Sequence, residues 1–135
     1  MRSIMIVPVL ALAAACSAVP PAEASAEAQS ELSVELAGRT AGEPQSCVRQ
    51  LDLTSNRSVG NALVFGTRGR NLIYVNRADC PRLDSTRALK TQTTIGRLCA
   101  GDIVEVFDPI AGFSYGSCGL QEFTPYRRQG SGGRG

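Results

Sequence analysis

The amino-acid sequence predicts a small, mostly β domain, built as an antiparallel β-barrel or a curved sheet, stapled by disulfides and containing at most one short helix. Short apolar or alternating runs recur between residues 44 and 128, separated by turns with glycine and proline. Four cysteines lie in the same stretch, an even number that suits two disulfides. No amphipathic segment of helix length lies between the runs, which argues against a parallel βαβ fold.

An apolar run opens the chain. Residues 4–15 read IMIVPVLALAAA behind Met-Arg-Ser, the layout of a secretory signal, and the run is shorter than the roughly 20 residues of a membrane-spanning helix. Residues 12–16 are similar to a bacterial lipobox, which would make 1–16 the leader and Cys16 the lipidated residue. Cleavage after Ala22-Glu23-Ala24 is the alternative and would make the leader residues 1–24.

Both leaders predict export to the periplasm or cell envelope. The lipobox predicts a lipoprotein held at the membrane by its N-terminal lipid anchor, whereas the second site predicts a soluble periplasmic or secreted protein. Residues 17–43 carry glutamate at positions 23, 27, 31, 35 and 43 against Arg39 alone, so we expect a disordered acidic tether. Within it, residues 24–36 contain good helix formers and could form a transient helix.

The remaining chain predicts a single β-rich domain over residues 44–128, followed by a disordered Gly/Ser-rich tail over 129–135. Residues 47–53 alternate apolar and polar side chains and predict the first strand. Apolar runs at 62–65 and 72–75 flank a glycine-containing turn, so residues 61–76 predict a hairpin.

The second half of the domain is less regular. We expect one short helical turn over residues 84–89 and strand structure around 91–95, where threonine and isoleucine favour it. Residues 103–107 predict a strand with Glu105 facing water, 108–112 a turn, and 113–120 the returning strand. Phe123 is expected to fill the core.

The four cysteines of this domain, Cys47, Cys80, Cys99 and Cys118, are widely spaced and the chain has no histidine, so their pattern does not fit a zinc site. Disulfides are the expected state in an exported protein, and three pairings are open. We favour Cys80–Cys99, which would close the least regular segment, and Cys47–Cys118, which would tie the first strand to the last.

Several kinds of chemistry are excluded or unsupported by the sequence. Without histidine there can be no Ser-His-Asp or Cys-His catalysis. The carboxylates of the domain form no paired motif, and residues 66–70 lack the Gly-Lys-Ser/Thr end of a phosphate loop. We therefore expect no catalytic residue, no metal and no cofactor, with a small carboxylate-dependent hydrolase as a remote alternative.

Arginines cluster around the predicted hairpin, at Arg68, Arg70, Arg77 and Arg82. They are a candidate anion-binding face for phospholipid headgroups, acidic glycans or an acidic envelope protein. The alternative is an ordinary solvated surface in an arginine-rich chain, since Lys90 is its only lysine. Nucleic-acid binding is not expected, because the chain has an export signal and no nucleic-acid-binding motif.

The cysteine-centred segments together resemble a family of small exported proteobacterial proteins catalogued as a domain of unknown function. The resemblance lies in C-V-R at 47–49, C-P-R-L at 80–83, L-C-A-G-D-I at 98–103 and C-G-L-Q-E-F-T-P at 118–125. It implies an export leader and four cysteines, and it implies no activity. Our leading hypothesis is a non-enzymatic envelope protein with a binding or structural role; an inhibitor of an envelope hydrolase, acting through residues 66–71, is the alternative.

Overall fold

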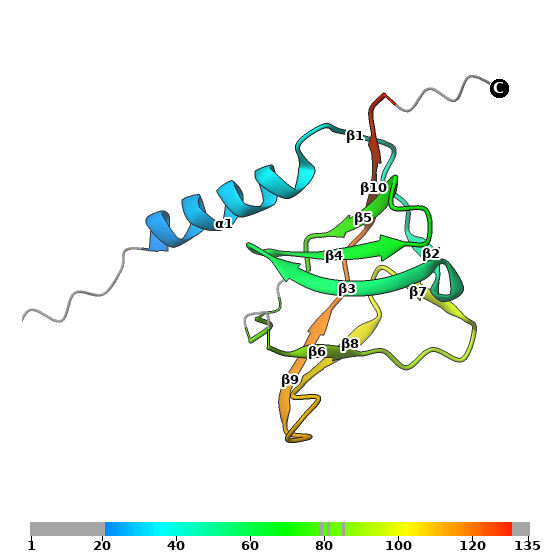
Figure 1. Ribbon diagram of the computed structural model, residues 1–135. Coiled ribbons are helices and arrows are strands. Elements are labelled where there is room, and N and C mark those ends of the chain that lie inside the picture. Colours follow the sequence, from blue (N-terminus) through cyan, green and yellow to red (C-terminus); the bar gives the residue numbers. More distant parts are fainter. Residues whose placement is uncertain (1–20, 79, 81, 85, 131–135) are drawn as a thin grey trace, which may run out of the picture.

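The computed structural model describes residues 21–78, 80, 82–84 and 86–130, which form one α-helix, one 3-10 helix and ten strands (Figure 1). Three of the strands follow one another with only short turns between them in Leu53–Asn76. In chain order the elements are α1 (Pro21–Leu36), β1 (Arg39–Ala41), β2 (Cys47–Arg49), the 3-10 helix (Gln50–Asp52), β3 (Leu53–Val59), β4 (Ala62–Thr67), β5 (Leu72–Asn76), β6 (Ala88–Lys90), β7 (Arg97–Cys99), β8 (Ile103–Phe107), β9 (Ser114–Gly119) and β10 (Phe123–Arg128).

The strands form three antiparallel sheets, which confirms the predicted fold class. The largest has the order β1-β10-β5-β4-β3, a second has the order β6-β8-β9, and β2 pairs with β7. The sheets do not close into a barrel among the described residues, so the curved-sheet form of the prediction is the one observed. The predicted hairpin over 61–76 is confirmed as β4 and β5, and the predicted strand over 103–107 is confirmed as β8.

The main core lies against one face of the five-stranded sheet. Phe65 of β4 and Phe123 of β10 pack ring against ring, with centroids 5.6 Å apart. Val104 and Val106 of β8 belong to the same buried cluster as these rings, so the two larger sheets share one core. Phe123 is fully buried, as the sequence predicts.

The opposite face of the five-stranded sheet is covered by α1, where the sequence predicts a disordered tether over residues 17–43. That prediction is wrong for the described part of the range, which contains α1 and β1. The physical reason is a small second core: Leu32 is 3% exposed and packs with Val64, Ile73 and Val75. Tertiary burial thus stabilises a helix whose composition alone supports only a transient one.

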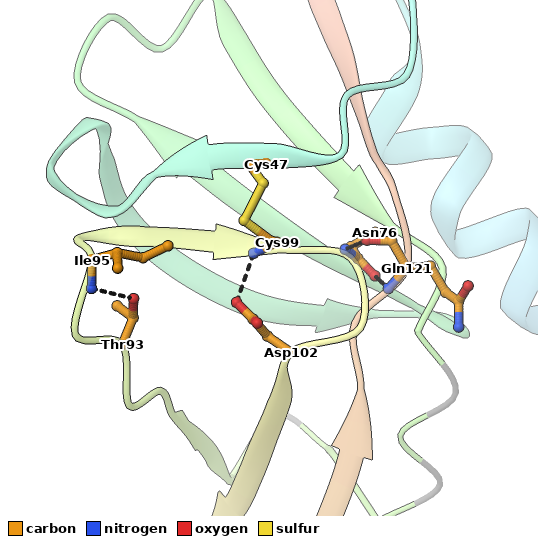
Figure 2. Close-up of a disulfide and its surroundings, with 7 residues drawn as sticks. All are labelled: Cys47, Asn76, Thr93, Ile95, Cys99, Asp102 and Gln121. Atoms are coloured by element: carbon orange, nitrogen blue, oxygen red, sulfur yellow. Dashed lines mark hydrogen bonds between the residues drawn. A yellow bond between two sulfur atoms is a disulfide. The ribbon is translucent and has the colours of Figure 1, made fainter.

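The predicted disulfide pairing is also wrong. The structure joins Cys47 to Cys99 and Cys80 to Cys118. Cys47 and Cys99 are direct partners across the β2–β7 ribbon, with Cα atoms 4.0 Å apart (Figure 2). Cys118 lies on β9, which pairs with β8 and not with the first strand of the domain, so a bridge to Cys47 has no geometric basis.

Two local predictions in the irregular segment are wrong as well. The described residues of 84–89 include no helix. The Arg87 N–H donates to the Asp84 carbonyl at 3.2 Å, the Asp84 carboxylate accepts hydrogen bonds from the backbone and hydroxyl of Thr86, and β6 begins at Ala88. Residues 91–95 form no strand, and β7 starts only at Arg97. Within residues 91–95 the Ile95 N–H donates to Thr93 Oγ1 at 3.3 Å, a side-chain hydrogen bond of the kind that competes with strand pairing.

A buried asparagine links the sheets. Asn76 at the end of β5 is 0% exposed, and its amide nitrogen donates to the Gln121 carbonyl at 2.7 Å. Its side-chain oxygen accepts from the backbone N–H of Gln121 (Figure 2) and also from that of Ala78. These bonds fasten the segment after β5 to the connection between β9 and β10.

Candidate functional site: an arginine groove

Strand register gathers three arginines on the helix-covered face of the large sheet. Arg57 of β3 lies opposite Val64, whose side chain belongs to the core under α1. Arg39 of β1 lies opposite Arg128 of β10, two residues along β10 from Tyr126, which packs on the same core. Because side chains alternate between faces along a strand, these guanidinium groups emerge where the apolar part of this face ends.

Together with two arginines of the β4–β5 loop they line a groove of about 590 Å³, which we call the arginine groove. Five arginines against a single glutamate leave it with a net positive charge. Its lining residues are Glu35, Arg39, Thr54, Ser55, Arg57, Gly66, Thr67, Arg68, Arg70, Ile73 and Arg128.

The floor of the groove is set by Gly66 and Ile73, which are partners across β4 and β5. Ile73 is 5% exposed, so the floor continues the core beneath α1. A Cβ atom at Gly66 would collide with Ser55 Oγ, so the absence of a side chain at this position lets the Ser55 hydroxyl lie against β4. The result is a shallow, partly apolar floor with hydroxyl groups and cations around it.

The loop that carries Arg68 and Arg70 is braced on both sides. Thr67 Oγ1 donates to the Leu72 carbonyl at 2.7 Å, and Arg39 donates to the carbonyls of Arg70 and Asn71, each at 3.3 Å. Arg70 itself adopts φ 52°, the left-handed conformation that non-glycine residues rarely take. The loop is therefore held in one shape, which presents both arginines at the groove.

The charges in the groove are only partly compensated. Glu35 of α1 accepts two hydrogen bonds from Arg57, one of them 3.1 Å long, and it is the groove's only carboxylate. Among the described residues Arg68, Arg70 and Arg128 form no ion pair. Like charges directly opposite on neighbouring strands, as at Arg39 and Arg128, destabilise a sheet, so an anion between them would relieve repulsion.

Two arginines outside the groove differ from the three uncompensated ones inside it, because each has a carboxylate partner within the protein. Arg49 forms a two-pronged contact with Asp52, whose hydrogen bonds and negative charge raise the pKa of the guanidinium. Arg87 contacts Asp84 and stacks 3.8 Å above the Tyr115 ring. These arginines have internal partners that stabilise their charge, unlike the three uncompensated ones in the groove.

The structure brings together half of the anion-binding face predicted from sequence. Arg68 and Arg70 lie in the groove, whereas Arg77 and Arg82 each line a different, separate pocket of the surface. Sequence reasoning missed Arg39, Arg57 and Arg128, which come from three separate strands. These three arginines come together only through the register of the paired strands, and closeness along the chain does not reveal that register.

The groove does not hold the acid–base pair that a carboxylate-dependent hydrolase needs, since Glu35 is its single carboxylate and is bonded to Arg57. Among the described residues no cluster of three Cys, Asp or Glu could hold a metal ion. What the arrangement can do chemically is bind anionic oxygens through guanidinium groups and hydroxyls.

The cysteine-centred motifs have structural roles where the structure describes them. Asp102 Oδ2 accepts a 2.7 Å hydrogen bond from the backbone of Cys99, which shapes the turn between β7 and β8 (Figure 2). Leu120 and Phe123 are buried in the main core. These residues hold the fold and do not line the groove.

Comparison with protein-family models, with characterised proteins and with solved structures found no match. The resemblance to a family of small exported proteins therefore stays a prediction. In the part of the chain that the structure describes, no helix is long and apolar enough to cross a membrane. Cys16 and the predicted leader lie outside the described residues.

Proposed function

We propose that this chain is an exported cell-envelope protein that binds an anionic partner, without catalysis, at the arginine groove. The observation that carries the proposal is the convergence of five arginines from β1, β3, β10 and the β4–β5 loop around a floor formed by Gly66 and Ile73. Gathering like charges costs free energy unless a ligand compensates them, so a groove of this kind is suited to anionic oxygens.

Two further observations support export. Both cysteine pairs of the domain are disulfide-bonded, a state typical of oxidising compartments. The sequence opens with a signal-like leader whose lipobox would place a lipid on Cys16. In a lipidated protein Cys16→Ser should move the chain from the membrane pellet to the soluble fraction. A wild-type chain already soluble, with Ser25 as its first residue, would support the alternative cleavage site instead.

Binding is tested with three labelled or immobilised probes: a glutamate-rich peptide, inorganic phosphate, and vesicles containing an anionic phospholipid. The variant Arg68→Gln/Arg70→Gln/Arg128→Gln should weaken binding of at least one probe at least tenfold, and raised salt should weaken it in the wild type. The matched control Arg77→Gln/Arg82→Gln/Arg97→Gln loses the same charge outside the groove and should bind normally. Equal losses in both variants, or no binding by the wild type, would contradict the proposal.

An inhibitor of an envelope hydrolase is the second candidate, favoured by the bracing of the β4–β5 loop. A loop held in one conformation loses little entropy when it enters an enzyme cleft. Arg39 and Thr67 hold this loop, and Arg68 is exposed on it. Purified protein should then inhibit an envelope protease or lysozyme-like enzyme stoichiometrically, and Arg68→Ala should abolish inhibition while leaving the fold intact.

A further inference from the structure

Helix α1 carries carboxylates along the edge that faces the large sheet. Glu27, Glu31 and Glu35 are spaced four residues apart and so lie along one side of the helix. Beside them run Ala28, Leu32 and Leu36 with the same spacing, and Leu32 and Leu36 pack on the sheet. The helix therefore presents an acidic row next to its apolar contact.

Two members of this row already bind the sheet as an anionic ligand would. Glu31 Oε2 accepts a 3.0 Å hydrogen bond from the backbone of Gly60, at the β3–β4 turn. Glu35 holds Arg57 through both carboxylate oxygens. The Glu35 side chain is 22% exposed and that of Arg57 is 48% exposed, so solvent and a competing anion can reach this pair.

The attachment of α1 to the sheet is narrow. Leu32 is its one fully buried apolar side chain among residues 26–36, and Gly60 allows the close approach of the helix at Ala28. The helix ends at Leu36, and Gly38, with φ 72°, leads directly into β1 and Arg39 of the groove. Movement of the last helical turn is thus coupled by the chain itself to one wall of the groove.

We propose that Glu35 is an internal occupant of the arginine groove, and that the physiological ligand is an acidic peptide segment which displaces it and loosens the end of α1. This inference rests on the proposed anion-binding function. The Glu35–Arg57 pair shows that a carboxylate on a peptide fits this site. Arg68, Arg70 and Arg128 offer further guanidinium groups that Glu35 does not use, so a segment with several carboxylates can make more contacts than Glu35 does.

Competition between an attached and an added carboxylate has a measurable consequence. While Glu35 occupies Arg57, only the fraction of molecules with an open site binds the ligand fully, and the apparent affinity falls by that fraction. Glu35→Gln should therefore raise the affinity for a labelled octaglutamate peptide by about three- to tenfold. Glu27→Gln, the same charge change at an exposed position one turn further from the groove than Glu31, should leave the affinity within about twofold.

Hydrogen exchange supplies a second measurement that does not depend on net charge. Saturating octaglutamate should raise exchange of the amides in residues 33–37 of the wild type, and Arg57→Gln should raise it without any ligand. Exchange of β4 and β5 should stay unchanged in both experiments, which would show that the sheet remains folded.

The outcomes separate this inference from the proposed function. If octaglutamate binds but Glu35→Gln behaves like Glu27→Gln and α1 exchange does not change, Glu35 is not a competitor and the inference is wrong, while anion binding stands. If only the anionic vesicles bind, the ligand is a lipid headgroup and the acidic-peptide assignment is wrong. If no probe binds, both the inference and the proposed function fail.

Discussion

Two regions of this chain keep their shape by different means. The hairpin region, β3 to β5 (Leu53–Asn76), contains no cysteine and consists of strands of five to seven residues joined by short turns. The stapled region, residues 77–122, contains two strands of only three residues and three of the four disulfide cysteines. Burial of β4 and β5 between α1 and the main core stabilises the hairpin region without a covalent link, whereas the three-residue strands β6 and β7 bury little apolar surface and the disulfides add stability to their region.

The largest expected effect tests the hairpin region. Phe65→Ala should lower the free energy of unfolding by about 3–5 kcal/mol, because it removes a buried ring and leaves a cavity against Phe123. Urea unfolding with the disulfides intact measures it. Ile110→Ala, at a 97% exposed position, is the control and should change stability by less than about 0.5 kcal/mol. A Phe65→Ala loss as small as that of the control would mean that this region does not depend on its core.

The next effect tests the stapled region. Cys80→Ala/Cys118→Ala should cost about 2–4 kcal/mol, since the bridge closes a loop of 38 residues in the unfolded chain. Under native conditions, hydrogen exchange of β8 and β9 should rise while β4 and β5 stay protected. The comparison is removal of the Cys47–Cys99 bridge, which closes a loop of 52 residues. That change should instead raise hydrogen exchange in the β2–β7 ribbon. Equal loss of protection in all strands would show that the two regions unfold as one unit.

A smaller effect is expected at the junction of the two regions. Asn76→Ala should destabilise the protein by about 1–3 kcal/mol, because the backbone N–H groups of Ala78 and Gln121 lose their buried acceptor. Thermal unfolding at several protein concentrations measures this loss. Asn56→Ala, at an exposed position of β3, should be nearly neutral. A neutral Asn76→Ala would indicate that water replaces the side chain and that the regions are not fastened there.

The smallest effect lies at the tip of the β8–β9 hairpin, in the stapled region. The backbone N–H groups of Ala111 and Ile110 donate to Asp108 and lower the pKa of its carboxyl group. A carboxyl group with a lowered folded pKa contributes stability above its unfolded pKa and loses that contribution as the pH falls through the folded pKa. Asp108→Asn should therefore lower the melting temperature slightly at neutral pH, and the difference from wild type should vanish in acid. A difference that persists in acid would contradict a role for the charge.

The sequence predicted the β4–β5 hairpin of one region and the strands β8 and β9 of the other, but it missed β3 and misassigned residues 84–95. Residues 61–76 contain two apolar runs on either side of a glycine-containing turn, so local pattern and tertiary burial agree, and the hairpin forms as expected. In residues 84–95 local propensity was a poor guide, because Asp84 and Thr86 satisfy each other within a turn and no strand forms over 91–95. The disulfide pairing failed for a related reason, since it depends on which strands become neighbours.

The candidate site shows the same division. Arg68 and Arg70 were found from sequence because they lie in a loop between two clear strands. Arg39, Arg57 and Arg128 are separated from them and from one another by up to 89 positions, and only the register of β1, β3 and β10 brings them to one face. Glu35 lies in the groove because burial of Leu32 holds α1 against the sheet. The composition of the helix alone did not indicate this packing.

By itself, the sequence determined the fold class, the hairpin of β4 and β5, the burial of Phe123 and the use of the domain's four cysteines in disulfides, because apolar periodicity and turn residues act over a few neighbouring positions. Tertiary structure alone decided the cysteine partners, the docking of α1 and the assembly of the arginine groove. Each of these depends on contacts between residues far apart in the chain, where side-chain burial and strand register outweigh local propensity.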